Sequence, residues 1–182
     1  MIIILEGMNG TGKTMLAKKL AERYNMEYQK DKRIEDTNKN GFDRYMKLAC
    51  NIEQNTIQDR FHLGECVYPV LKKDGREPLT IIEQNQIERI LDIRKAILIY
   101  CTASDEFIKN VYQTRGEDFI KLEQITQERE LFEHALRSCT LFRSTYYVEK
   151  CITDDELWWP VLDKTVSSLR LAESLQEGAC TL

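Results

Sequence analysis

The sequence of 182 residues lacks several features that would assign it to a common class of protein. Its six cysteines form no C-x-x-C pair, and neither of its two histidines forms a cluster with them, so the usual pattern of a zinc site is excluded. No stretch approaches the ~20 apolar residues of a membrane span, and the first residues have no basic segment of a signal peptide. We therefore expect free thiols in a reducing cytoplasm.

The sequence also lacks an excess of basic residues. Its formal net charge is −4, with 26 Lys and Arg against 30 Asp and Glu. Two local basic clusters, Lys30 to Arg33 and Lys72 to Arg76, have acidic neighbours, and we interpret them as solvated faces in preference to phosphate or nucleic-acid contacts. A nucleic-acid partner is therefore not expected. The composition, with 42% hydrophobic residues, is that of a globular protein of one domain, 1–182.

What the chain does have is a phosphate-binding loop. Four apolar residues, Ile2 to Leu5, predict a buried strand that leads through Glu6 into the segment GMNGTGKT, and helical periodicity follows. In such a loop, glycines let backbone N–H groups approach a polyphosphate, the lysine neutralises its oxygens, and the final hydroxyl holds Mg²⁺. We therefore expect ATP and Mg²⁺ as cofactors, bound by Gly7, Asn9, Gly10, Thr11, Gly12, Lys13 and Thr14.

The rest of the chain alternates between apolar strand patterns and amphipathic helix patterns. Further strands are predicted at 26–30, 55–60, 96–101 and 144–150, and a final helix at 161–172. Thr80 and Glu83 match a capping box at the start of one intervening helix, and Ser104 matches the cap of another. This alternation predicts an α/β protein in three layers, a parallel five-stranded sheet with helices on both faces, whose ligands lie outside the carboxyl ends of the strands.

A second chemical landmark, Asp59 and Arg60, ends the strand predicted at 55–60 and should therefore lie beside the phosphate loop. A charged segment punctuated by glycine, TRGEDFIK, begins at Thr114 between two predicted helices. Phosphoryl transfer needs a cation on the acceptor phosphate and a lid that keeps water out. Arg60 and a small lid at 114–125 fit these needs, although a strand-end cap for Asp59 and a surface ion pair for Arg60 are alternatives.

These motifs resemble those of thymidylate kinases and related deoxynucleoside monophosphate kinases of bacteria and viruses. The family's loop, F-E-G-x-D-G-x-G-K-[ST], is similar to LEGMNGTGKT at 5–14. Its D-R-[YFH] motif with a later small-residue-Tyr pair is similar to Asp59-Arg60-Phe61 with Val67-Tyr68, and its lid, R-G-E-L-D-R-I-E-Q, resembles 115–124 with one residue inserted. The resemblance implies a P-loop kinase that transfers the γ-phosphoryl of ATP to the 5′-phosphate of a deoxynucleoside monophosphate, such as dTMP.

The resemblance also implies roles for single residues. Asn9 stands where the family has an aspartate on the nucleotide sugar, and Thr11 stands where some members have a catalytic arginine, so the missing cation is expected from the lid. The implied catalytic residues are Lys13, Asp59, Arg60, Arg115 and Lys121, and the implied metal ligands are Thr14 and Asp59. Substrate contacts are expected from Glu6, Asn9, Phe42, Arg44, Tyr45, Arg60 and Tyr68, with core packing as the alternative for Phe42 and Tyr45.

Two other functions are compatible with the phosphate loop. The first is a kinase that phosphorylates a hydroxyl group on a deoxynucleoside or on a modified base in DNA, for which Glu6 or Asp59 would act as general base. The second is a nucleotide sensor without catalysis, which would have little use for an acceptor-phosphate arginine. The sequence leaves the base and the oligomeric state open, a homodimer being one alternative.

Overall fold

The computed structural model describes the chain except for residues 31–40, 117–119, 154–157 and 180–182, and the side chains of 115, 151–153 and 172–179. One sheet runs through the centre, with the strand order β2-β3-β1-β4-β5 and every neighbouring pair parallel. The strands are β1 (Ile2–Gly7), β2 (Glu27–Lys30), β3 (Thr56–Asp59), β4 (Ala96–Thr102) and β5 (Arg143–Tyr147). The predicted parallel, five-stranded sheet is confirmed.

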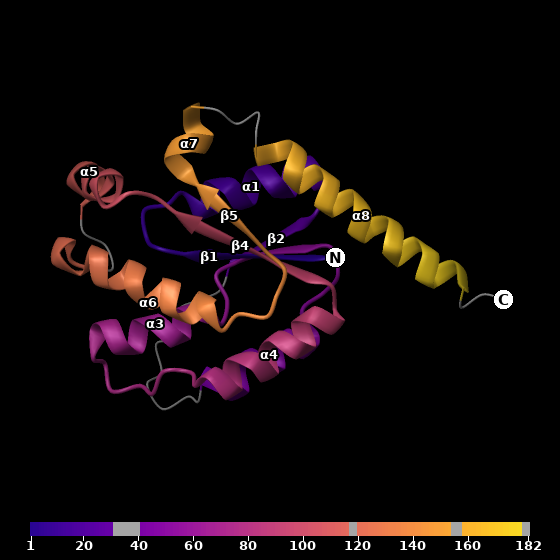
Figure 1. Ribbon diagram of the computed structural model, residues 1–182, viewed down its shortest axis with the longest axis horizontal. Coiled ribbons are helices and arrows are strands. Elements are labelled where there is room, and N and C mark those ends of the chain that lie inside the picture. Colours follow the sequence, from indigo (N-terminus) through magenta and orange to yellow (C-terminus); the bar gives the residue numbers. More distant parts are fainter. Residues whose placement is uncertain (31–40, 117–119, 154–157, 180–182) are drawn as a thin grey trace.

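Helices cover both faces of this sheet (Figure 1). One face carries α1 and α8, whereas α3, α4 and α6 lie on the other, where α2 packs on α4 and α3 packs on α6. The helices are α1 (Lys13–Tyr24), α2 (Gly41–Asn51), α3 (Leu63–Lys72), α4 (Ile81–Ile93), α5 (Asp105–Arg115), α6 (Ile125–Arg137), α7 (Val148–Thr153) and α8 (Trp158–Ala179), with a 3₁₀ turn, η1 (Leu122–Gln124), before α6. The three-layer α/β fold follows the prediction.

The centre of the sheet forms the core because its strands are covered on both faces. All six residues of β1 and all seven of β4 are buried, which matches their unbroken apolar runs. The edge strand β2 is exposed at its two ends and half-buried at its two middle residues. The phosphate loop thus follows directly from a strand whose residues are all buried.

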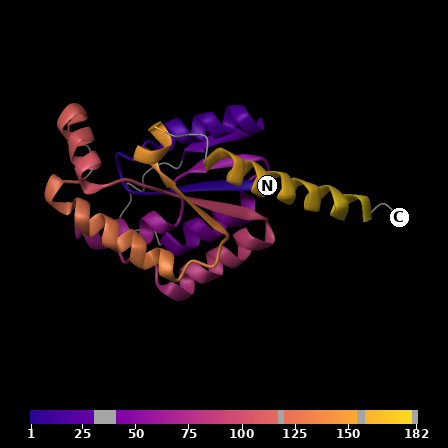
Figure 2. The ribbon, with the colours of Figure 1, turned by 45° about the horizontal axis from the view of Figure 1, so that its top comes forward.

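The long helix α8 crosses one face and extends past the end of the sheet (Figure 2). Its Asp163 carboxylate accepts hydrogen bonds from Arg23 Nε at 2.9 Å and Tyr24 Oη at 2.7 Å, which fixes it to α1. Pro160 lies in the first turn of α8, where a missing backbone N–H costs no helical hydrogen bond. The helix begins at Trp158, three residues before the predicted start at Val161.

Several local predictions can be compared with the structure. The Thr80–Glu83 capping box and the Ser104 cap are confirmed, and the four described cysteines are free thiols. The strand predicted at 144–150 is wrong beyond Tyr147, because α7 begins at Val148. Helix α3 was not predicted. No helix in the described part of the chain is long and apolar enough to cross a membrane.

Candidate active site

The phosphate loop leaves β1 at a point where only glycine fits. Gly7 has φ of 126°, and a Cβ atom there would lie 2.1 Å from the carbonyl oxygen of Cys101 on β4. Gly10 and Gly12 also have positive φ, at 79° and 68°, a region that side chains rarely adopt. The backbone therefore turns sharply from β1 into the N-terminus of α1, which is the geometry that directs N–H groups at an anion.

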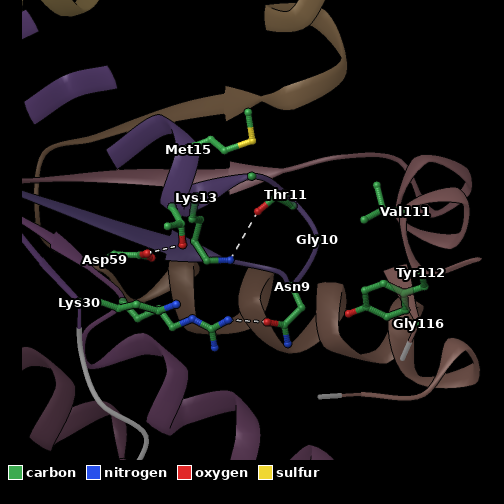
Figure 3. Close-up of a pocket in the computed structure, with 13 residues that line it drawn as sticks. Asn9, Gly10, Thr11, Lys13, Met15, Lys30, Asp59, Val111, Tyr112 and Gly116 are labelled. Atoms are coloured by element: carbon green, nitrogen blue, oxygen red, sulfur yellow. Dashed lines mark hydrogen bonds between the residues drawn. The ribbon is translucent and has the colours of Figure 1, made fainter. Parts of the chain in front are cut away.

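Lys13 lies folded within this loop (Figure 3). Its ammonium group donates hydrogen bonds to the Gly7 carbonyl at 2.8 Å, to the Met8 carbonyl, and to Thr11 Oγ1 at 3.4 Å. Burial removes water from the charge and lowers the pKa of Lys13 to about 8, and the positive charge of Arg60 adds to this effect. An incoming polyphosphate would offer this cation the opposite charge that it lacks.

Thr14 and Asp59 are brought together from α1 and the end of β3. The Thr14 hydroxyl donates to Asp59 Oδ2 at 2.6 Å, and the Tyr28 hydroxyl donates to the same oxygen at 3.1 Å. The other oxygen, Asp59 Oδ1, is buried with no hydrogen-bond partner among the described residues. A hydroxyl and a carboxylate with one unused oxygen suit Mg²⁺, which takes few protein ligands when it is bound together with phosphates.

The opposite side of the pocket carries positive charge. Arg60 adopts a left-handed φ of 75° directly after β3, and its Nη2 donates to Asn9 Oδ1 at 2.5 Å (Figure 3). Lys30, the last residue of β2, pairs in register with Asp59 and also lines the pocket. Lys30 was interpreted from the sequence as part of a solvated cluster. Although it is exposed, it contributes to a cavity of about 340 Å³, a volume within the range of small-molecule sites.

Glu128, on α6, is a component of this region that the sequence analysis missed. Its side chain is fully buried, and its Oε1 accepts hydrogen bonds from the Asn9 backbone N–H at 3.1 Å and the Tyr68 hydroxyl at 2.9 Å. Burial raises the pKa of Glu128, while the bond from Asn9 and the charge of Lys13 partly oppose the rise. A signal was present, because Glu128 lies on the apolar stripe of α6 between Ile125 and Phe132.

The other predicted substrate residues are placed in and near the core. Glu6 is buried, and its Oε1 accepts from the backbone N–H groups of Phe61 at 3.0 Å and Leu63 at 2.8 Å, so it holds the turn between β3 and α3. Tyr45 packs edge-on against Phe61, as its core alternative predicts. None of the following is among the described residues that line the pocket: Glu6, Phe42, Arg44, Tyr45 and Tyr68. Their substrate contacts stay predictions.

The predicted lid is described only at its two ends. Arg115 is the last residue of α5, and Gly116, with φ of 86°, lines the pocket. Lys121 is exposed, with its Nζ 4.0 Å from Glu123 Oε1. The centre of the segment, 117–119, lies outside the described residues. The roles of Arg115 and Lys121 therefore stay predictions.

The chain is similar to known proteins in its three-dimensional structure. No protein-family model matches the chain, and no curated protein sequence matches it. The YorR protein of Bacillus subtilis, solved with phosphorylated GDP, superposes with a TM-score of 0.77 at 25% sequence identity over 96% of this chain and 98% of YorR. The chain has a P-loop kinase fold.

More distant structures share this fold. Deoxyadenosine kinase from M. mycoides, solved with dCTP, has a TM-score of 0.59 at 17% identity and covers 90% of this chain and 100% of its own. A gluconokinase from Sinorhizobium meliloti has a TM-score of 0.52 at 11% identity, with 96% of this chain and 94% of that chain covered. The names of these two neighbours give different acceptors, a nucleoside and a sugar acid, so the shared fold leaves the acceptor open.

Proposed function

We propose that this protein is a kinase that transfers the γ-phosphoryl group of ATP to the 5′-phosphate of a deoxynucleoside monophosphate. The observation that carries the proposal is the charge of the pocket. Two cations, Lys30 and Arg60, line it together with the phosphate loop. Among its described lining residues the one carboxylate is Asp59, and this group accepts hydrogen bonds from Thr14 and Tyr28. Such a pocket suits two anionic ligands.

The contacts of the two candidate general bases disfavour a hydroxyl group as the acceptor. A hydroxyl must lose its proton to a general base during transfer, whereas a phosphate oxygen is already ionised. Of the two bases suggested by the sequence, Glu6 is fully buried and occupied by backbone N–H groups. Asp59 accepts hydrogen bonds from Thr14 and Tyr28, and we assign it to the metal ion.

The described residues divide the work of phosphoryl transfer between them. When bound, ATP with Mg²⁺ supplies the phosphoryl group and neutralises part of its charge. The loop amides and Lys13 would hold the donor phosphates, Thr14 and Asp59 would hold the metal, and Arg60 with Lys30 would orient the acceptor phosphate toward the loop. We assign the remaining cation to the lid, at Arg115 or Lys121.

The identity of the acceptor base rests on the sequence motifs. Their resemblance to thymidylate kinases supports dTMP or a related pyrimidine nucleotide. The phosphorylated GDP in YorR supports binding of a nucleotide polyphosphate by this fold, and it makes a guanine nucleotide the first competitor to compare.

The test is release of ADP from ATP and Mg²⁺ with a panel of acceptors. The panel contains the deoxynucleosides, their 5′-monophosphates including dTMP and dGMP, and duplex DNA, and Lys13→Ala serves as the control for contaminating kinases. We expect turnover with at least one monophosphate that exceeds turnover with the matching deoxynucleoside by ~100-fold or more, since only the monophosphate carries the anion that Arg60 and Lys30 recognise. Preference for a deoxynucleoside or for DNA would overturn the proposal.

A further inference from the structure

The described contacts connect helix α6 to the acceptor side of the pocket through one residue of the phosphate loop. Asn9 donates twice to Glu128 Oε1, from its backbone N–H at 3.1 Å and from its Nδ2 at 3.3 Å. On its other side, Asn9 Oδ1 accepts from Arg60 Nη2 at 2.5 Å. The three side chains therefore form a continuous chain of hydrogen bonds, Glu128 to Asn9 to Arg60.

This series of hydrogen bonds depends on the amide side chain of Asn9 at its centre. An amide has donors on its nitrogen and acceptor lone pairs on its oxygen. Because Glu128 Oε1 accepts and never donates when ionised, it selects the nitrogen of Asn9, and the oxygen is then left to face the Arg60 guanidinium. An aspartate at this position, as in the thymidylate kinase motif, would place a second carboxylate against Glu128.

Burial and hydrogen bonds hold the Glu128 carboxylate in one position. It has no exposed surface, and the Tyr68 hydroxyl donates to the same Oε1 at 2.9 Å. Tyr68 in turn packs edge-on against Phe132 of α6, with ring centroids 5.9 Å apart. A buried carboxylate with several donors is costly to rearrange, because moving it leaves those donors without partners.

We propose that Glu128 is a positioning residue, which through Asn9 holds the Arg60 guanidinium in the orientation that binds the acceptor phosphate. The inference rests on the proposed function, because it assumes that Arg60 binds this phosphate. Its role is distinct from that of a catalytic residue, since Glu128 is not among the described residues lining the pocket. The arrangement also gives a physical reason for Asn9, which is the residue that can serve both neighbours.

The inference predicts a specific pattern of kinetic changes. Glu128→Ala removes the oxygen that accepts from both the Asn9 backbone N–H and Nδ2, and leaves Nδ2 with its longer bond to Tyr68 Oη at 3.4 Å. The Asn9 amide that contacts Arg60 is then held less firmly, so the KM for the monophosphate should rise by about tenfold or more. The KM for ATP should change by less than about threefold. Glu128→Gln keeps an oxygen acceptor at the same position and should restore most of the monophosphate KM. The matched control is Glu130→Ala, which removes an exposed carboxylate from the same helix.

The deciding experiment is a double-mutant cycle between Glu128→Ala and Arg60→Ala, measured as the KM of the best monophosphate from the acceptor panel. If Glu128 acts through Arg60, Glu128→Ala should raise this KM in the wild-type background and change it by less than about twofold once Arg60 is alanine. An equal factor in both backgrounds would overturn the inference, because it would show that Glu128 supports the fold or the site without Arg60.

Two controls keep the outcomes distinct. Thermal unfolding of each variant reports loss of folding, and if Glu128→Ala does not fold, Glu128→Asp takes its place, since it keeps the charge and withdraws the oxygens by one methylene group. If Arg60→Ala leaves the monophosphate KM unchanged, the acceptor clamp of the proposed function is wrong. If Arg60→Ala raises that KM, and Glu128→Ala raises the KM of the Arg60→Ala variant by the same factor as it raises the KM of the wild type, the inference fails while the proposed function stands.

Discussion

We predict that the buried state of Lys13 makes ATP binding sensitive to alkaline pH. Its ammonium group donates to carbonyl and hydroxyl oxygens, with no carboxylate among its hydrogen-bond partners in the described part of the chain, and burial lowers its pKa to about 8. A nucleotide polyphosphate binds best to the charged lysine. Because pH 7 lies one unit below this pKa and pH 9 lies one unit above it, roughly 90% of the free protein carries the charge at pH 7 and roughly 10% does at pH 9.

The expected magnitude follows from this fraction. Between pH 7 and pH 9 the affinity for ATP should fall by about tenfold, which corresponds to about 1.4 kcal/mol of binding free energy. The direction is fixed by the sign of the linkage. Binding of an anion favours the protonated lysine, so the affinity for ATP is highest below the pKa that Lys13 has in the free protein, and it falls above that pKa.

The assay is equilibrium binding of a fluorescent ATP analogue with Mg²⁺ from pH 7 to pH 9.5. Lys13→Met should bind weakly at every pH and show no decline across this range, and Lys18→Met, a change at an exposed lysine of the same helix, should behave as the wild type. Wild-type affinity that stays constant from pH 7 to pH 9.5 would refute the reasoning, because Lys13 would then not be the buried cation that meets the phosphates.

Three further predictions concern the acceptor, the fold and the lid. Arg60→Ala should raise the KM for the monophosphate by ~100-fold and the KM for ATP by less than about threefold in steady-state kinetics, since the guanidinium is assigned to the acceptor alone; equal effects on both substrates would place Arg60 elsewhere. Burial alone would raise the pKa of Glu88, but hydrogen bonds and charge from His62, with bonds from the Thr140 backbone and Gln84, lower it to about 2. This carboxylate contributes stability above pH 4.5 that is lost as the pH falls toward 2, so urea unfolding should show the wild type losing about 2 kcal/mol more than Glu88→Gln between pH 6 and pH 3; equal losses would contradict this account. Arg115→Ala or Lys121→Ala, at least one of them, should lower kcat by ~100-fold while ATP affinity changes by only a few-fold, as expected for a cation that acts in the transition state; wild-type kcat in both and in the double variant would remove the lid from the mechanism.

The sequence predicted the sheet because its strands have strong local patterns. The runs at Ile2 to Leu5 and at Ala96 to Cys101 are apolar without interruption, as is typical of strands covered on both faces. Helix α3 escaped prediction because it contains Gly64 and Pro69, both poor helix formers, within its ten residues.

The candidate site was predicted where a motif exists and missed where contacts across the fold decide. Lys13, Thr14 and Asp59 meet at one edge of the sheet, as strand ends in a parallel sheet must. Lys30 and Glu128 have no motif of their own, and their place near Arg60 depends on strand order and on the packing of α6. The substrate contact of Glu6 stays a prediction, and its hydrogen bonds from the backbone N–H groups at the start of α3 depend on contacts that no sequence pattern shows.

The central claim is that the phosphoryl group passes from ATP to a nucleotide phosphate, and the position of the transferred group tests it most directly. The protein is incubated with ATP labelled at the γ-phosphorus, Mg²⁺ and each deoxynucleoside monophosphate or deoxynucleoside, and the products are separated and degraded to locate the label. The account predicts label in the β-position of a deoxynucleoside diphosphate, formed by the wild type and lost by ~100-fold or more in Lys13→Ala. Label on the 5′-oxygen of a deoxynucleoside, or only in free phosphate, would contradict it.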